Sequence, residues 1–136
     1  MRKGYIFFVC LILVILSASV VSAGLFGDDS GKLNVDNLEI NSNGYGMYDV
    51  TCDLVADKDF SYLEMVIVFY DDSGAIIEKN PLVWNMNDIP KGQTIKVSGT
   101  AYISGDNVPA KAEVYIFDSA LSSDLDKAIF NETVMM

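Results

Sequence analysis

The reactive side chains of this 136-residue chain are almost entirely carboxylates: it holds 19 aspartates and glutamates, 9 lysines and arginines, and no histidine. Histidine is the usual base of Ser and Cys hydrolases and the commonest zinc ligand, so its absence excludes the Ser/Cys-His catalytic sites. A carboxylate pair could still act on sugars. Because acids this numerous fall close together by chance, we predict a protein that is not an enzyme. A carboxylate-based hydrolase or an enzyme accessory domain is the alternative.

Two short acidic clusters are the candidates for a metal site. Asp57 and Asp59 form one, and Asp71 and Asp72 form the other, just ahead of a Ser-Gly pair. Extracellular calcium sites use carboxylates and carbonyls from such loops. Neither cluster has the EF-hand spacing, and Asp, Ser and Gly are also what a tight hairpin prefers. We therefore predict turns here, with weak calcium binding as the alternative and no cofactor.

Aromatic side chains are the candidates for binding, with seven tyrosines and one tryptophan in the chain. Tyr102 lies on the polar face of its predicted strand, so we expect it to be exposed and able to hold a carbohydrate or a protein. Trp84 follows an Asn-Pro break and either plugs the sandwich or lies at its edge. Tyr48 and Tyr70 are expected in the core. Asn131 opens an Asn-Glu-Thr sequon, the candidate glycosylation site.

Cysteine usage predicts a domain held together without disulfides. Cys10 lies within the apolar N-terminal run, which leaves Cys52 alone in the rest of the chain. Cys52 alternates in phase with Val50 and Leu54, so we expect it to point inward. A cysteine in such a place behaves as a small buried hydrophobe.

The first 23 residues have the pattern of a secretory signal peptide. Arg2 and Lys3 precede the apolar run 5–16, and Val21-Ser22-Ala23 supplies a small-x-small cleavage site. An uncleaved membrane anchor is the alternative. Cleavage after Ala23 leaves seven lysines against 19 acids, a net charge of −12. We therefore expect a secreted protein, or one on the extracellular face of the cell membrane, with no nucleic-acid partner.

A flexible lead at 24–32 and an all-β domain at 33–136 are expected to follow. Alternating and apolar runs separated by turn residues are typical of an antiparallel β-sandwich of six to seven strands. Strands are predicted at 33–40, 48–55, 62–70, 75–79, 95–103 and 112–118, with 82–84 continuing the fourth or starting another at an edge.

Several irregularities of this pattern predict local detail. The apolar phase slips near Asn37, which indicates a bulge or a break. A turn is predicted at 41–44, and Gly99 in an inward position indicates a bulge or close backbone packing. The end of the chain is expected to form a short helical turn, capped by Ser119 or Ser122, and then an edge strand.

Two segments resemble the FxLYD domain family. The run Ile67-Val68-Phe69-Tyr70-Asp71-Asp72-Ser73-Gly74, followed by Ala75-Ile76-Ile77, resembles its strand, Tyr-Asp, Gly-turn and second-strand pattern. Ile67 stands where the family has phenylalanine, and Phe69 where it has leucine. Ile89-Pro90-Lys91-Gly92-Gln93-Thr94 is similar to its later Pro-x-Gly-x-Thr turn. The resemblance covers roughly residues 33–118. It implies an exported, immunoglobulin-like β-sandwich without assigned catalytic residues.

These observations predict a non-enzymatic module for binding, adhesion or assembly at the cell envelope. Its partner is expected to be an envelope protein or a glycan. Contact with a membrane is expected only through the N-terminal segment, if that segment is not cleaved. A further alternative is a membrane-tethered subunit that pairs with another protein through an edge strand.

Overall fold

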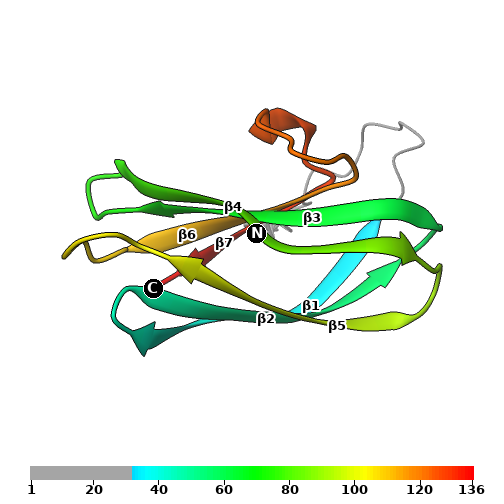
Figure 1. Cartoon of the computed structure of the whole chain (residues 1–136), viewed down its shortest axis with the longest axis horizontal. Coiled ribbons are helices and arrows are strands. Elements are labelled where there is room, and N and C mark those ends of the chain that lie inside the picture. Colours follow the sequence, from blue (N-terminus) through cyan, green and yellow to red (C-terminus); the bar gives the residue numbers. More distant parts are fainter. Residues whose placement is uncertain (1–31) are drawn as a thin grey trace, which may run out of the picture.

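The computed structural model describes residues 32–136, which form two antiparallel sheets packed face to face (Figure 1). The first sheet has the order β1-β2-β5, with β1 at Leu33–Gly44, β2 at Met47–Ala56 and β5 at Thr94–Tyr102. The second has the order β4-β3-β6-β7, with β4 at Ile76–Ile89, β3 at Phe60–Tyr70, β6 at Lys111–Phe117 and β7 at Phe130–Met135. The predicted all-β antiparallel sandwich is confirmed. The predicted signal or anchor, and the lead up to residue 31, lie outside the described residues.

The core fills the space between the sheets with alternate residues of each strand. Strand β2 contributes Val50, Cys52 and Leu54, all 4% exposed or less, so the predicted inward position of Cys52 is confirmed. Strand β3 contributes Leu63, Met65, Ile67 and Phe69, and β6 contributes Ala112, Val114 and Ile116. The alternation in the sequence is therefore the alternation of the strand faces.

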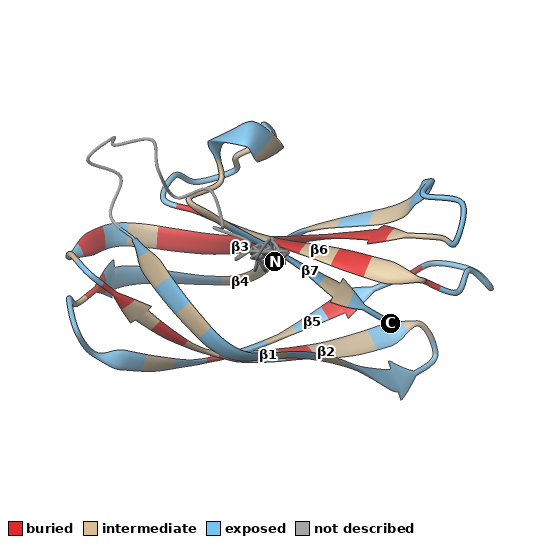
Figure 2. Ribbon diagram, turned by 180° about the vertical axis from the view of Figure 1, so that it is seen from behind, coloured by how far each residue is buried: buried red, intermediate tan, exposed pale blue. Residues whose placement is uncertain are grey.

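Strand β3 is buried along most of its length (Figure 2), so its burial includes the face that points away from the first sheet. Val66 and Val68 on that face are fully buried. Residues 118–129, which include the short 3₁₀ helix η1 (Leu125–Lys127), fold over this outer face (Figure 1). The run 62–70 is apolar on both faces, which is typical of a strand covered on both sides, and residues 118–129 supply the second cover.

Glu64 attaches the covering segment to the sheet. It is the one buried charged residue between positions 32 and 136. Its carboxylate accepts hydrogen bonds from the backbone N–H groups of Leu121 and Ser122, both at 3.0 Å, and from the Tyr62 hydroxyl at 2.8 Å. Burial of a carboxylate is tolerated when several donors satisfy it, as they do here.

Two bulges shape the sheets. The register of β1 against β2 shifts between Asp36 and Glu39, where Asn37 has φ 54°, so the predicted bulge near Asn37 is confirmed. Strand β4 runs on through Asn80-Pro81 as one edge strand, with a bulge opposite Val66. This bulge brings the Val83 carbonyl oxygen against Gly99, where any Cβ would overlap it. The predicted close packing at Gly99 is confirmed.

Two local predictions are wrong. The first hairpin turn lies at Tyr45-Gly46 and not at 41–44, because β1 stays paired with β2 up to Gly44. The helical turn η1 is capped by Asp124, whose side chain accepts a hydrogen bond from the Asp126 N–H, and not by Ser119 or Ser122. The predicted last edge strand is confirmed as β7.

Candidate binding surface

The two ends of the sandwich carry different loops. The chain enters at Lys32, whose carbonyl accepts a hydrogen bond from the Asp57 N–H, so the β2–β3 turn lies at this proximal end. The β1–β2 turn, the β3–β4 hairpin and the loop 103–110 meet at the opposite, distal end (Figure 1). Hydrogen bonds join them there, from Ile103 N–H to the Gly46 carbonyl (2.8 Å) and from Ala110 N–H to the Tyr70 carbonyl (2.8 Å).

Exposed apolar side chains concentrate toward the distal end. Between residues 32 and 136, ten large hydrophobic side chains are exposed, and seven of them belong to the distal loops and the strand ends beside them. Three of them lie together at the β1–β2 turn and form what we term the distal apolar surface: Tyr45, Met47 and Tyr102. Ile76 and Met135 lie on the outer face of the second sheet, in one row with Tyr70 and Lys111. Single exposed hydrophobic residues are normal, but a gathering of them indicates an interaction site.

Tyr102 lies in the distal apolar surface and has a fixed backbone. It pairs with Met47 across the β2–β5 ladder, its ring lies beside Gly46, and the residue is 51% exposed. The Asn80 side chain accepts from the Tyr102 N–H (2.9 Å) and donates to the Tyr102 carbonyl (2.7 Å). The predicted exposure of Tyr102 is therefore seen, on a backbone held in place from both sheets.

Tyr45 is a candidate that the sequence pattern did not reveal. It is 96% exposed at the tip of the β1–β2 turn. Tyr45 and Gly46 have φ values of 55° and 75°, as the central residues of a type I′ hairpin turn require. Tyrosine is unfavourable in this left-handed region, where Asn and Gly are preferred. The signal that could have identified it is the tripeptide Gly44-Tyr45-Gly46 between two alternating runs.

Several carboxylates also lie at the distal end. Asp71, Asp72 and Glu78 lie on or beside the β3–β4 hairpin, and Asp106 lies in the loop 103–110. Glu78 accepts hydrogen bonds from the hydroxyl and the N–H of Ser104, which join the hairpin to that loop. The distal end therefore carries several carboxylates, together with Lys79 and Lys111 on the neighbouring strands.

Three of the four predicted calcium candidates brace turns, and the fourth, Asp72, is exposed on the β3–β4 hairpin. The Asp71 carboxylate accepts from the Ser73 hydroxyl (2.6 Å) and from the N–H groups of Ser73 and Ala75, both at 2.9 Å. These bonds, led by that from Ser73, lower the pKa of Asp71. Asp57 accepts from the Lys32 N–H and Asp59 from the Lys91 N–H, both at 2.8 Å. Among residues 32–136, no group of three or more Cys, His, Asp or Glu side chains is placed to hold a metal ion.

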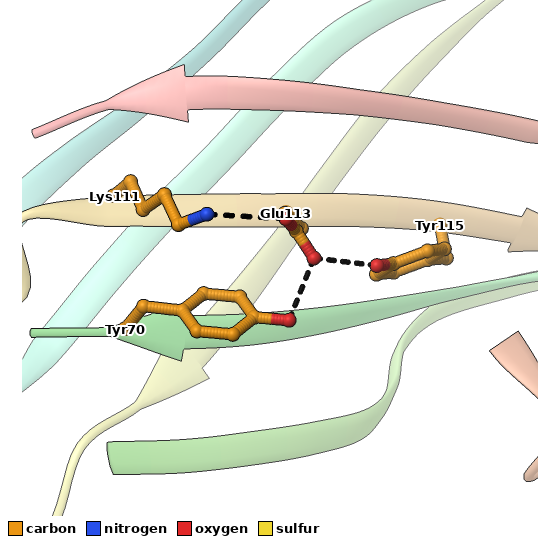
Figure 3. Close-up of polar contacts among 4 residues, drawn as sticks. All are labelled: Tyr70, Lys111, Glu113 and Tyr115. Atoms are coloured by element: carbon orange, nitrogen blue, oxygen red, sulfur yellow. Dashed lines mark hydrogen bonds and ion pairs between the residues drawn. The ribbon is translucent and has the colours of Figure 1, made fainter. Parts of the chain in front are cut away.

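A second polar cluster lies on the outer face of the second sheet, next to the distal end (Figure 3). The hydroxyls of Tyr70 and Tyr115 both donate to Oε2 of Glu113, at 2.6 and 2.5 Å. Lys111 lies 3.4 Å from Oε1 and above the Tyr70 ring. Burial, followed by the Glu113 carboxylate, raises the pKa of both tyrosines. The pKa of Glu113 is lowered, because the hydrogen bonds from Tyr115, Tyr70 and Lys111 together outweigh its burial.

The position of Tyr70 in this cluster corrects the expectation that it lies in the core. Tyr70 lies half-buried on the outer face and not in the core, because its strand position shares the face of Val66 and Val68. Tyr48 does pack against the core, with its ring 5.1 Å from that of Phe69. With the Lys111 charge opposed by Glu113, the cluster braces β3 against β6.

Trp84 and Asn131 lie apart from the distal apolar surface. Trp84, opposite Met65 on the edge strand β4, is half-buried and packs against the core, so it plugs the side of the sandwich. Asn131 is exposed on β7 opposite Tyr115. Both residues remain candidates for binding and for glycosylation, respectively.

Cys52 lies in an environment that suppresses thiol chemistry. Desolvation by burial, with smaller contributions from Asp53 and Glu132, raises the pKa of its thiol to about 11. The thiolate is the reactive form, and it is scarce at neutral pH when the pKa is this high. The site therefore offers no activated nucleophile.

A depression of about 410 Å³ lies at the proximal end. It is lined by Asp59, Phe60, Ser61, Asp88, Ile89 and Pro90. Two of these residues are acids, as the carboxylate-based alternative requires, but the Asp59 carboxylate already accepts the Lys91 N–H. No helix within residues 32–136 is long and apolar enough to span a membrane.

Comparison with known proteins yields only distant structural likenesses. No family model matches the sequence, and no curated protein matches it. β-Glucosidase 3B from Thermotoga neapolitana, in complex with α-D-glucose, aligns over 81% of this chain and 16% of its own length, at 10% identity and a TM-score of 0.42. The GH3 β-glucosidase of Bifidobacterium adolescentis aligns over 82% of this chain and 18% of its own, at 13% identity and a TM-score of 0.44. The chain thus spans less than a fifth of these enzymes, whose activity is not carried over to it.

Proposed function

We propose that this protein is an exported, non-enzymatic binding module that contacts an envelope protein or glycan through the distal apolar surface. The observation that carries the proposal is the concentration of exposed apolar side chains, Tyr45 and Tyr102 among them, at one end of the sandwich. Exposed aromatic side chains on a rigid scaffold are the usual anchors of a binding interface. Tyr102 has such a scaffold, because hydrogen bonds to Asn80 hold its backbone.

The placement of the two ends supports a role at the cell surface. Lys32, the first described residue, lies at the proximal end, so the predicted signal or anchor segment would join there. The intervening strands have about 10 residues and separate the two ends by about 30 Å. A module attached at its proximal end would present the distal apolar surface away from the attachment point. Export, cleavage and localisation are part of this proposal.

The fold we propose is immunoglobulin-like, in keeping with the resemblance to the FxLYD family. Seven strands in two antiparallel sheets support it. The fourth strand differs from that of an immunoglobulin constant domain, because β4 pairs with β3 in the second sheet and not with β5 in the first. Membership of the FxLYD family remains a prediction.

Photo-crosslinking in the cells that produce the protein tests the proposal. A photoreactive phenylalanine analogue replaces Tyr102 in the full chain, and the matched control places it at Gln93, which is exposed at the proximal end. We expect a discrete adduct from position 102 and none from 93. Equal adducts from both positions, or none from 102, would overturn the proposed binding role. Mass spectrometry of the native N-terminus tests export: Gly24 as first residue indicates release, and an intact N-terminus indicates an anchor.

The carboxylate-based hydrolase remains the second candidate, because Asp59 and Asp88 line one depression. Its test is release of chromophore from a panel of nitrophenyl glycosides by the purified chain. Activity that disappears in both Asp59→Asn and Asp88→Asn, while the folded fraction stays unchanged, would replace the binding proposal with an enzymatic one. We expect no turnover.

A further inference from the structure

We propose that Asn131 carries an N-linked glycan whose first sugar lies against the ring of Tyr115. The proposal goes beyond the binding function and rests on the proposed export, because N-linked glycans are added to exported chains. It follows from the Asn-Glu-Thr sequence at 131–133, from the place of β7 in the second sheet and from the side chains around Asn131.

The acceptor sequence lies on an accessible strand. Strand β7 is an edge of the second sheet, so one side of its backbone pairs with no other strand of residues 32–136. Asn131, Glu132 and Thr133 are all exposed. Because Asn131 and Thr133 are two residues apart in a strand, their side chains point to the same face of the sheet. The two side chains that define the acceptor sequence are therefore displayed together.

The Asn131 amide is free to be modified. Its side chain forms no hydrogen bond with any residue between positions 32 and 136. Asn80 and Asn37, by contrast, use their side-chain amides to hold Tyr102 and Asp53. Replacement of one amide proton of Asn131 by a sugar therefore breaks no contact of the fold.

The modification is the transfer of a sugar chain from a polyprenyl phosphate or diphosphate carrier. Nδ2 of Asn131 forms a bond to C1 of the first sugar, and the bond between C1 and the phosphate oxygen of the carrier breaks. The carrier phosphate leaves with that oxygen. The amide nitrogen gives up one of its two protons to solvent, and nothing is oxidised or reduced.

Tyr115 is placed to contact the first sugar. It lies directly opposite Asn131 in the β6–β7 ladder, where opposed side chains are about 4.5–5.5 Å apart at Cβ. Its hydroxyl donates to Glu113 (Figure 3), and its ring stacks at 6.5 Å from that of Phe117, so the ring is held in place. A half-buried tyrosine ring offers an apolar face to the C–H groups of a sugar.

Mass spectrometry of the intact chain, taken from the medium and the membranes of the producing cells, tests the proposal. We expect the mass to exceed that of the polypeptide by one glycan. The added mass should disappear in Asn131→Gln and in Thr133→Ala, and remain in Thr133→Ser, which keeps the acceptor sequence. The matched control is Asn87→Gln, which changes an exposed strand asparagine without Ser or Thr two residues later and should keep the added mass.

The outcomes separate the glycan from the export on which it depends. An exported chain with the mass of the polypeptide alone, or added mass that survives in Asn131→Gln, would overturn the glycan and leave the export standing. A chain recovered only from the cytosol would overturn the export, and the glycan with it.

A double-mutant cycle tests the contact with Tyr115. The urea midpoint of the glycosylated wild type should lie above that of Asn131→Gln, and this difference should disappear when both chains carry Tyr115→Val. A difference that is the same in both backgrounds would overturn the contact between the first sugar and Tyr115.

Discussion

Asn80 and Tyr102 are joined by two hydrogen bonds that connect the two sheets. The Asn80 amide nitrogen donates to the Tyr102 carbonyl at 2.7 Å, and its amide oxygen accepts from the Tyr102 N–H at 2.9 Å. A neighbouring strand would offer the same donor and acceptor, so one side chain of edge strand β4 replaces a strand partner for edge strand β5. The contact protects the end of β5 and fixes the backbone that carries the Tyr102 ring.

Asn80→Ala should therefore destabilise the protein by about 1–2 kcal/mol, since it removes two hydrogen bonds of about 1 kcal/mol each. The measurement is the free energy of unfolding from urea denaturation. Asn87→Ala, an exposed asparagine in the same strand, is the control and should change stability by less than about 0.5 kcal/mol. Equal effects of the two substitutions would show that the Asn80–Tyr102 contact does not stabilise the sandwich.

Glu64→Gln should loosen the segment that covers the second sheet. The two carboxylate oxygens of Glu64 accept the N–H groups of Leu121 and Ser122, and an amide offers only one oxygen to them. We expect a loss of roughly 1–3 kcal/mol in unfolding free energy. Hydrogen exchange should become faster at Leu121 and Ser122 and stay unchanged in β2.

The control for Glu64 is Glu39→Gln, which changes an exposed carboxylate on β1. It should alter neither stability nor the exchange of residues 118–129. Unchanged exchange at Leu121 and Ser122 in Glu64→Gln would mean that the segment is held by its apolar contacts with the sheet and not by this carboxylate.

The fold was predictable where the sequence alternates with the period of a strand. Successive strand residues point to opposite sides, so the order of apolar and polar residues predicts which side chains point inward. This order predicted the inward position of Cys52, the two apolar faces of β3 and the bulge at Asn37. The turn at Tyr45-Gly46 was not predictable in this way, because residues 41–44, where the turn was predicted, belong to β1 and pair with β2.

The contacts that hold the candidate surface and the covering segment were not predictable from local pattern. Asn80 and Tyr102 are 22 residues apart, and Glu64 and Leu121 are 57 apart. In the sequence, Asn80 before Pro81 indicates a break in the strand, and Glu64 interrupts an apolar run without a visible partner. Their hydrogen-bond partners become known only from the packing of the sheets. Exposure of Tyr102 was predictable because it needs only strand phase, whereas the gathering of apolar residues at one end depends on which loops meet.

Cys52 should make the stability depend on alkaline pH. Its thiol has a pKa of about 11 in the folded protein and about 8.5 when unfolded. The folded state therefore keeps the proton longer than the unfolded state, so stability is full below the unfolded pKa and falls as the pH rises toward 11. Over this window the wild type should lose about 2–3 kcal/mol more than Cys52→Ala, measured by urea denaturation at each pH. Identical slopes would show that Cys52 titrates normally. Thiol reagents at pH 8 should label Cys52 only after unfolding.

Tyr45→Asn should stabilise the protein while weakening its binding. Asparagine is favoured at the first central position of a type I′ turn, where Tyr45 has φ 55°, and a non-glycine residue in the left-handed region costs about 1–2 kcal/mol. We expect a gain of about 1 kcal/mol in unfolding free energy. Tyr45→Ala is the matched control: it removes the same exposed ring but keeps an unsuitable residue, so its stability should stay near that of the wild type. Both variants should weaken the crosslink from position 102 to the partner to the same extent. A stabilised Tyr45→Asn that binds as the wild type does would show that the strained tyrosine is not an anchor of the distal apolar surface.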